Sequence, residues 1–303
     1  MKIAGITMTM DDGFKFTEWC KWYEEYKDEL YIHIVVDNAS HPSYLKQVKD
    51  YFKDSIIIER KSNGGCTAAY NDGIRKALEF KEVDAIALCG NDVRFKKGAL
   101  SEMYNFLFSN PEYGMVGGVV FKKDSDVVES FGDTLNIIGV PKTNYSNCKI
   151  DDLPDTLLVS FVNGGVNMSK REFYEKVGLQ DERLFMYNDE VDMYYRAKKA
   201  GFKEAVTKKA ETWHQHIPNP IVPGMREKMS YLNGRNRVYL IHKHKLGLCG
   251  FMYFLVFLFR ETRVFITHCN IPQIRSVYYA KLRGFKAGFD GNMDNSFIEN
   301  KQV

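Results

Sequence analysis

Residues 31–40 read YIHIVVDNAS, an apolar run that ends abruptly in polar residues. Residues 31–36 have the composition of a buried strand, and residues 37–40 are of the types that favour turns and caps. Comparable apolar runs lie on either side, each separated from the next by a helical pattern. We predict strands at 3–8, 31–36, 55–59 and 84–88, and helices at 16–26, 44–52 and 67–79. Strands that alternate with helices indicate βαβ units, hence an α/β fold with a mostly parallel sheet.

Polar residues follow several of these predicted strands. Asp37 and the pair Asn91-Asp92 each come directly after an apolar run, and Asn63-Gly64-Gly65 precedes a predicted helix. In open α/β sheets, ligands bind beyond the carboxyl ends of the strands. Glycines ahead of a helix also let free backbone N–H groups approach a diphosphate closely. Taken singly, each motif can also be an ordinary turn, but all of them fall where such sheets bind their ligands.

A second motif lies at residues 188–202, NDEVDMYYRAKKAGF, where three carboxylates open a predicted helix. Asp189, Glu190 and Asp192 would each cost several kcal/mol, by rough estimate, if buried as unpaired ions. One interpretation is therefore a solvated acidic first turn, which the helix dipole favours. The apolar run at 184–187 argues instead for carboxylates at the edge of a buried cleft. A carboxylate in that position would act as a general base.

The same segment resembles family 2 glycosyltransferases, inverting enzymes that use nucleotide-diphosphate sugars. Their E-D-x-D-like stretch, with its F-F-M-Y-like lead, matches residues 184–192, and their following arginine and K-A-G-Y/F ending match Arg196 and residues 199–202. The Glu-Asp order is swapped in this chain. The resemblance therefore places Glu190 at the catalytic position, leaves Asp189 as the alternative base, and includes Asp192 in the catalytic set.

The resemblance also implies a donor site. The motif around Asp37 matches a V-D-N-x-S stretch whose aspartate contacts the nucleotide base, here a uracil or thymine. Asn63-Gly64-Gly65 and residues 69–73 match an N-x-G and A-x-N-x-G pattern, and an arginine in 235–237 would reach phosphates, unless it lies on a solvated helix face. The expected donor contacts are Thr7, Asp37, Asn63, Gly65, Asn71, Asn91 and Arg237, with Gly164 and Gly165 near the acceptor.

A metal site is implied at residues 88–93, LCGNDV, where the family has its metal-binding D-x-D. Asp92 aligns with the last acid, whereas Gly90 offers no ligand. Either Asn91 substitutes, or Asp92 holds Mg²⁺ or Mn²⁺ together with water and the donor phosphates, which are ligands that these cations accept. His214 or His216 would complete the site. The alternative is a solvated turn aspartate.

Charge is divided unevenly along the chain. Residues 203–303 hold 16 Lys and Arg against 7 Asp and Glu, and residues 1–202 hold 26 against 32. Within the basic third, residues 246–259 (LGLCGFMYFLVFLF) are uncharged but shorter than the roughly 20 residues that span a bilayer. Basic residues flank this run, a pattern that predicts peripheral membrane contact through 235–290. A buried core helix with basic ends fits the run equally well. We expect no nucleic-acid partner, because base-stacking motifs are missing outside the apolar runs.

Composition predicts a compact protein, with 45% hydrophobic and 14% aromatic residues. The six cysteines show no Cys-x-x-Cys spacing and fit reduced thiols in the cytosol. Residues 1–14 do not read as a signal peptide, so we expect a cytoplasmic protein on the inner face of the membrane. We predict a catalytic domain at 1–216, with a nucleotide-sugar half at 1–110 and an acceptor half at 111–216, and a basic helical region at 217–303.

The resemblance implies a GT-A fold with a C-terminal helical appendage, and transfer of a sugar from a UDP- or dTDP-sugar to a hydroxyl of a lipid-linked or polysaccharide acceptor. Residues 281–291 (KLRGFKAGFDG) are similar to bacterial surface-polysaccharide enzymes of the rhamnosyl or galactosyl type. Two alternatives stay open. A sugar nucleotidyltransferase should have a Gly-rich, Arg-containing turn after the first strand, which residues 5–8 do not provide. A glycan-binding or scaffold protein with a decayed site would account for Gly90 and the swapped acids.

Overall fold

One ten-stranded sheet organises the first part of the computed structural model, which describes residues 1–215 and 224–296. The predicted metal ligand His216 and the predicted boundary at 217 lie outside these residues. The strands of this sheet, in chain order, are β1 (Ile3–Thr9), β2 (Ile32–Asp37), β3 (Ile56–Glu59), β4 (Ala85–Cys89), β5 (Val93–Phe95), β6 (Tyr113–Lys122), β7 (Val128–Ser130), β10 (Thr156–Val159), β11 (Val166–Lys170) and β12 (Lys203–His214). A separate hairpin joins β8 (Asp133–Leu135) and β9 (Pro141–Thr143).

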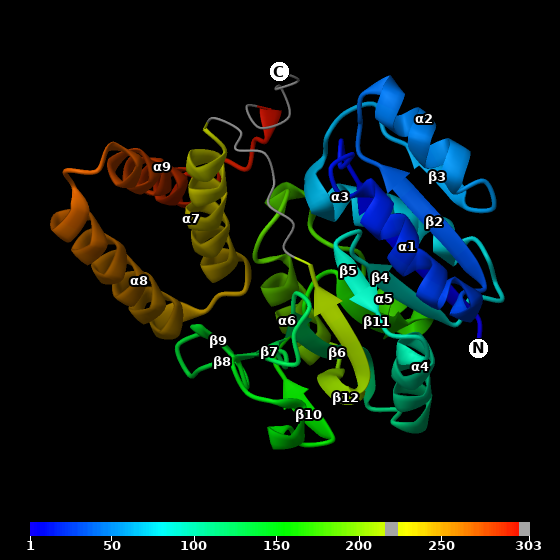
Figure 1. Cartoon of the computed structure of the whole chain (residues 1–303). Helices are drawn as coiled ribbons and strands as arrows, with labels where there is room; N and C mark the ends of the chain where they lie inside the picture. Colours follow the sequence, from blue (N-terminus) through cyan, green and yellow to red (C-terminus); the bar gives the residue numbers. More distant parts are fainter. Residues whose placement is uncertain (216–223, 297–303) are drawn as a thin grey trace.

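The helices between these strands cover both faces of the sheet (Figure 1). They are α1 (Phe16–Tyr26), α2 (Pro42–Tyr51), α3 (Gly65–Leu78), α4 (Ala99–Ser109), α5 (Arg171–Val177) and α6 (Asp189–Lys199). Apolar residues of α3, α5 and α6 form one core cluster with the sheet, whereas α4 packs in another and α1 and α2 in a third. Alternation along β1 explains this layering, because Ile3 and Ile6 point to opposite faces and join different clusters.

Strand pairing divides the sheet into two parts. The order is β10-β12-β6-β11-β4-β1-β2-β3, and the four strands from β4 to β3 are parallel, as the βαβ pattern predicts. Beyond β4 the sheet is mixed, since β11 lies antiparallel between β4 and β6. The α/β class is confirmed, and a further parallel pair joins β6 to β12 on the far side of β11. Pairing between segments this far apart in sequence leaves no local signal in either one.

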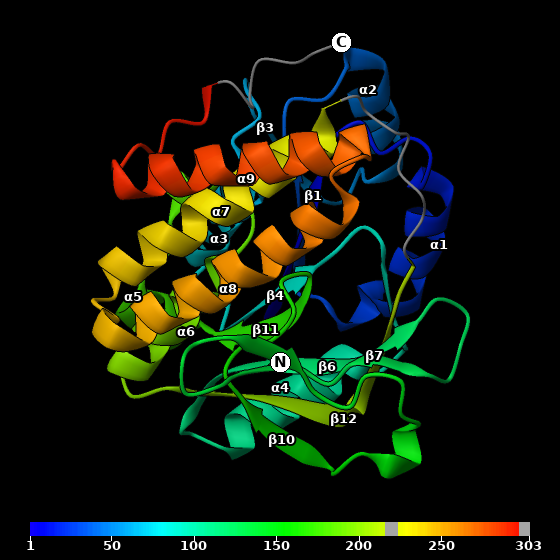
Figure 2. The ribbon, with the colours of Figure 1, turned by 90° about the vertical axis from the view of Figure 1, so that its left-hand side faces the viewer.

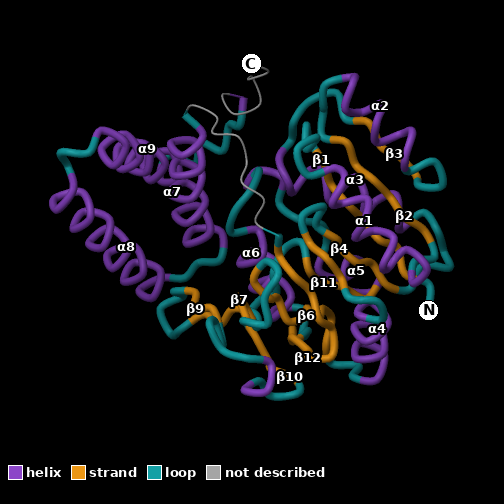
Figure 3. Tube along the Cα trace, viewed as in Figure 1, coloured by secondary structure: helices purple, strands orange, loops and turns teal. Residues whose placement is uncertain are grey.

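The C-terminal part is entirely helical (Figure 3). It consists of α7 (Met225–Lys243), α8 (Gly247–His268) and α9 (Pro272–Phe289). Gly234 on α7 and Gly284 on α9 let the two backbones come close, because a Cβ at Gly234 would lie 2.7 Å from the Lys281 carbonyl oxygen. Figure 2 shows α8 on the outer side of this group. Among the described helices, none combines the length and apolar character that crossing a bilayer requires.

Candidate active site

A cleft of about 720 Å³ opens where the carboxyl ends of β1 and β4 meet the loops before β11 and α6. Its size is within the usual range for small-molecule sites. The cleft brings together seven residues predicted from sequence: Asn91, Asp92, Gly164, Gly165, Asp189, Glu190 and His214. Residues that the sequence reasoning did not select also line it, including Asp12, Lys15, Cys66, Tyr70, Asn163 and Tyr187. Asp12 follows a predicted strand as Asp37 does, so its position was a usable signal.

The acidic pair enters the cleft from the first turn of α6. Asp189 is buried and Glu190 is half-buried. Opposite them, Gly164 makes room, because a Cβ there would lie 2.7 Å from Glu190 Oε1. Burial raises the pKa of both carboxyls, and the charge of Asp189 raises the pKa of Glu190 further. A carboxylate with a raised pKa beside an open cleft is a stronger base than a solvated one.

Asp192 points away from the cleft. Its side chain is fully buried, with Arg196 Nε at 2.9 Å, Lys243 Nζ at 2.6 Å and His244 Nε2 at 2.8 Å. Burial alone would raise its pKa, but the hydrogen bond from His244 and the charges of Arg196 and Lys243 lower it overall. Residues two apart on a helix are rotated by about 200°, so Asp192 and Glu190 lie on opposite sides of α6. Its predicted catalytic role is therefore replaced by a structural one.

Asp92 forms the opposite corner of the cleft. Its Oδ2 lies 3.7 Å from Lys15 Nζ and 3.7 Å from His214 Nε2. Burial opposes ionisation, yet the neighbouring His214 and the charge of Lys15 lower the pKa of Asp92 to about 2. Lys15 also lies 3.2 Å from Asp12 Oδ1. The lysine ammonium thus occupies the position of a cation between two carboxylates.

The donor set at this corner suits a divalent cation in its chemistry. Carboxylates and an imidazole are acceptable ligands for Mg²⁺ or Mn²⁺. Asn91 Nδ2 donates to Asp12 Oδ2 at 2.7 Å, so the atom of Asn91 that could bind a cation is its Oδ1. Across residues 1–215 and 224–296, no three His, Cys, Asp or Glu side chains are already grouped closely enough to hold a metal ion. A cation at Asp92 would therefore need further ligands from outside the described residues.

The predicted nucleotide contacts fall into two groups. Asp37 is buried at the end of β2, where one oxygen accepts a hydrogen bond from Ser40 N at 3.1 Å. Its other oxygen, Oδ1, has no hydrogen-bond partner among the described residues. Asn63 shapes the glycine loop, since its Oδ1 accepts from Asn38 Nδ2 at 2.8 Å and from Gly65 N at 2.9 Å. Gly65 has a φ of +74° and packs against the Phe185 carbonyl so tightly that no Cβ fits.

Of the predicted donor contacts, Asn91 lines the cleft, whereas Asp37, Asn63 and Gly65 do not. The three others also lie outside it and have structural partners. Thr7 Oγ1 lies 3.1 Å from His33 Nε2 in the core. Asn71 holds the loop before α6, donating from Nδ2 to the Gln180 carbonyl at 2.9 Å and accepting from Gln180 N at 2.9 Å. The Arg237 guanidinium lies 4.5 Å from the centre of the Phe257 ring on α8. It is neither a solvated surface group nor a side chain that faces the cleft.

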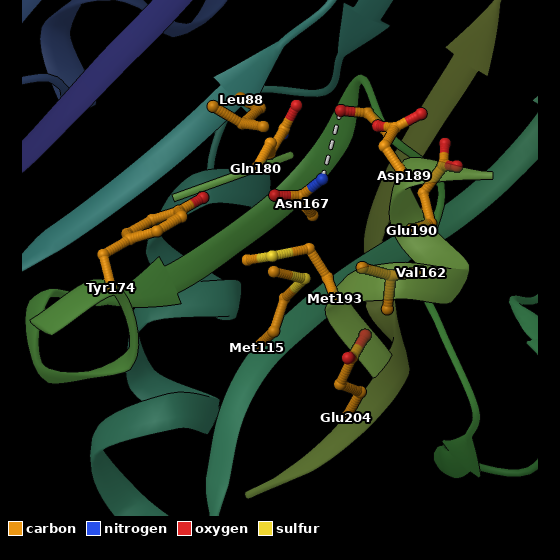
Figure 4. A pocket seen from close by; sticks show the side chains of 11 residues that line it. Leu88, Met115, Val162, Asn167, Tyr174, Gln180, Asp189, Glu190, Met193 and Glu204 are labelled. Carbon is orange, nitrogen blue, oxygen red and sulfur yellow. Dashed lines mark hydrogen bonds between the residues drawn. The ribbon is translucent and has the colours of Figure 1, made fainter. Parts of the chain in front are cut away.

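A small cavity of about 20 Å³ lies directly behind the acidic pair (Figure 4). This is space for roughly one water molecule. Four of its lining side chains carry a buried polar atom without a hydrogen-bond partner in the structure: Asn167 Oδ1, Tyr174 Oη, Gln180 Oε1 and Glu204 Oε1. Burial raises the pKa of Glu204 to about 8, which a backbone hydrogen bond from Val162 only partly opposes. Glu204 is therefore a neutral acid at pH 7.

This burial makes stability depend on pH. Because the pKa of Glu204 rises from 4.5 to about 8 on folding, the folded state keeps a proton that the unfolded state releases between these values. The contribution of Glu204 to the free energy of unfolding thus falls as pH rises through this window. Glu204→Gln should unfold like the parent protein at pH 5 and be more stable by on the order of 2–4 kcal/mol at pH 9. Urea titrations at both pH values measure the difference.

The exposed Glu112 gives the matched control. Glu112→Gln should leave the pH dependence of unfolding unchanged, since a solvated carboxyl titrates alike in both states. Equal stabilities of Glu204→Gln and the parent protein at pH 9 would mean that Glu204 reaches solvent.

Comparisons with known proteins agree with this architecture. The model of glycosyl transferase family 2 matches residues 24–178, more than half of the chain. The low-salt glycan biosynthesis hexosyltransferase Agl10 of Haloferax volcanii is 23% identical over 215 residues, covering 67% of this chain and 65% of the relative. The aligned part is thus slightly less than two thirds of that protein's length.

Solved structures share the fold at low sequence identity. GalNAc-T7, crystallised with UDP, GalNAc and Mn²⁺, superposes with a TM-score of 0.62 at 12% identity, over 80% of this chain and 48% of that one. The mannosyltransferase PcManGT from Pyrobaculum calidifontis, in complex with GDP-Man and Mn²⁺, superposes with a TM-score of 0.56 at 14% identity. The superposition covers 95% of this chain and 87% of that one. These neighbours confirm the predicted GT-A fold. By its family match, the chain belongs to glycosyl transferase family 2.

Proposed function

We propose that this protein is an inverting glycosyltransferase, which moves a sugar from a nucleotide-diphosphate donor to an acceptor hydroxyl. The observation that carries the proposal is the meeting of Asp92 with the Asp189–Glu190 pair in one cleft at the carboxyl ends of parallel strands. Family membership supports the same activity. Donor and acceptor would enter this cleft between the two acidic corners.

Glu190 is the proposed base. It is the more exposed member of the pair, and Gly164 leaves open space beside its carboxylate. From there it would take the proton of the acceptor hydroxyl, whose oxygen attacks the anomeric carbon on the side opposite the leaving nucleotide. Carbon–oxygen bond formation and loss of the diphosphate then invert the configuration. Burial of the pair keeps water away from the base and so strengthens its interaction with the acceptor proton.

The donor is proposed to be a UDP- or dTDP-sugar. Asp37 supports this choice, because its Oδ1 is buried at the strand end without a hydrogen-bond partner in the described chain. An oxygen of this kind can accept the ring N–H of a uracil or thymine. Lys15, 8% exposed beside Asp92, places a positive charge where a diphosphate would lie.

A divalent cation is proposed at the Asp92 corner. Asp92 and His214 would hold it, with water and donor phosphates as the other ligands, and it would neutralise charge on the leaving diphosphate. The two structural neighbours described above contain Mn²⁺.

Removing Asp92 tests this assignment. Asp92→Ala should weaken donor binding in Mn²⁺ by roughly 10- to 100-fold, because the metal loses a carboxylate ligand. Isothermal titration with UDP, in Mn²⁺ and in EDTA, measures it. Asp126→Ala, at an exposed carboxylate outside the cleft, is the control. Equal affinities of parent and Asp92→Ala in Mn²⁺ would remove the metal from Asp92.

The acceptor is proposed to be lipid-linked and reached at a membrane surface. Helix α8 buries only one side, including Tyr253 and Phe257, and exposes a row of large apolar residues: Leu248, Phe251, Met252, Leu255, Val256, Phe259, Val264 and Ile266. Arg260 and Arg263 are exposed on the same helix. Apolar and cationic groups side by side are typical of helices that lie in the interface of an anionic bilayer. This arrangement favours the membrane-surface interpretation of residues 246–259 over a fully buried helix.

Two negative charges introduced on the exposed apolar face of α8 should prevent membrane binding. Phe251→Glu with Phe259→Glu removes two aromatic anchors worth roughly 3 kcal/mol together, or about a hundred-fold in partition. Sedimentation with phosphatidylglycerol vesicles measures the binding. Ile137→Glu alters another exposed apolar residue, 91% exposed and distant in sequence, and should bind like the parent. Vesicle binding by the double variant at the parent level would place the contact elsewhere.

A panel of UDP-, dTDP- and GDP-sugars with Mn²⁺ tests the function as a whole. A ligand that binds only the folded state raises the melting temperature, so one nucleotide class should shift it. Product formation with that donor would then be followed on acceptors extracted from membranes. A melting temperature that no donor changes would favour a decayed, glycan-binding protein over an enzyme.

A further inference from the structure

The loop that delivers the acidic pair to the cleft has an unusual backbone. Phe185, Tyr187 and Asn188 have φ values of 65°, 69° and 63°, and none of them is glycine. Each such conformation is unfavourable for an L-residue, so neighbouring groups must impose it. Because α6 begins at Asp189, the direction of this backbone determines where Asp189 and Glu190 lie.

Helix α7 supplies those groups. The Asn236 side chain is fully buried, and its Nδ2 donates to the carbonyl oxygens of Leu184 at 2.9 Å, Met186 at 2.9 Å and Tyr187 at 3.0 Å. One amide nitrogen therefore contacts three carbonyls of a single turn. Phe185, with φ 65° and ψ −58°, forms a γ-turn in which Met186 N donates to the Leu184 carbonyl at 2.7 Å.

Arg235 fixes the orientation of this amide. It is also fully buried, and its Nε donates to Asn236 Oδ1 at 3.1 Å, which directs the Asn236 nitrogen toward the loop. Its Nη2 donates to the Arg183 carbonyl at 3.0 Å. Its Nη1 reaches Asn295 Oδ1 at 2.9 Å, beyond the end of α9. Across the described residues, no carboxylate forms an ion pair with this guanidinium, so its donors serve backbone and amide oxygens.

From these contacts we propose that Asn236, oriented by Arg235, is a positioning residue for the catalytic carboxylates. The C-terminal helices are then part of the catalytic machinery, because they hold the 184–187 loop in the one shape that directs Glu190 to the acceptor. This role rests on the proposed function of Glu190. Asn236 acts through the loop and does not touch the reacting atoms.

Asn236→Ala tests the role against a matched control on the same helix. Ser230 is buried on α7 and donates to the Val277 carbonyl of α9 at 3.0 Å, with no described hydrogen bond to the loop. Ser230→Ala loses one buried hydrogen bond and Asn236→Ala loses several, so both should melt lower, Asn236→Ala by more. Only Asn236→Ala should lower kcat, by roughly 10- to 100-fold at an unchanged donor Kd, since a misplaced base slows the chemical step.

Two further readouts keep the test decisive. In Asn236→Ala, hydrogen exchange at the amides of 184–190 should speed up, and the acid limb of the kcat–pH profile should shift because the carboxyl environment changes. If Asn236→Ala does not fold, Asn295→Ala alters the same network from the surface and should show smaller changes of the same kind. A kcat and an exchange pattern equal to those of Ser230→Ala would overturn the proposal. If the parent protein transfers no sugar, the exchange data alone decide it, and the proposed function fails separately.

Discussion

Glu190→Gln should lose sugar transfer almost completely, with kcat lower by roughly 10²–10⁴-fold, the range expected when a general base is removed. The amide has the size of the carboxylate but cannot take the acceptor proton. Donor binding should persist, because the nucleotide is proposed to bind toward Asp92 and Asp37. Single-turnover transfer measures kcat, and calorimetric titration with the donor measures the affinity.

Asp189→Asn distinguishes the two members of the acidic pair. Burial and the charge of Asp189 both raise the pKa of Glu190, so removing that charge should lower it. The acid limb of the kcat–pH profile would then move to lower pH, with substantial activity kept. Full activity in Glu190→Gln, together with an inactive Asp189→Asn, would transfer the role of base to Asp189.

Asp192→Ala should have the largest effect on stability. The side chain is fully buried and meets Arg196, Lys243 and His244, so its removal leaves cations without their shared carboxylate. Breaking a buried ion pair from one side typically costs about 3–5 kcal/mol. The loss also disconnects α6 from the end of α7. Guanidinium unfolding monitored by tryptophan fluorescence gives the free energy.

An exposed ion pair on α2 provides the control for Asp192→Ala. Asp50 meets Lys46 on the surface of α2, where solvent screens the interaction. Asp50→Ala should therefore unfold almost like the parent protein. If Asp192→Ala did the same, water would have to reach the pocket around α6 and α7.

Much of the fold could be predicted because its signal is local. The helix at 16–26 and the strands at 3–8 and 84–88 follow from periodicity within each segment, and the structure places them within a residue or two. Helices α4 and α5 were not predicted. The antiparallel insertion of β11 was not predictable in this way, since its partners β4 and β6 are distant in sequence.

The site was predictable in part for the same reason. The sequence pointed to the strand end at Asp92 and to the acidic helix start at Glu190, and in the structure both residues line one cleft. Membership of a motif does not determine where a side chain points, which is why Asp192 and Asn71 hold neighbouring segments instead. Lys15 escaped notice because a single lysine after a strand has no pattern, and its place between Asp12 and Asp92 exists only in three dimensions.

The 184–187 loop is held from two sides by segments far apart in the chain. Gly65 and Thr67 contact the Phe185 carbonyl from one side, and Asn236 binds the neighbouring carbonyls from the other. Such long-range contacts form only after the segments that carry them have already come together. During synthesis, strands β1 to β4 can pair before residue 236 is made, whereas the contacts of Asn236 with the loop cannot form until then. We therefore expect the loop to reach its final shape late in folding, after the strands that precede it.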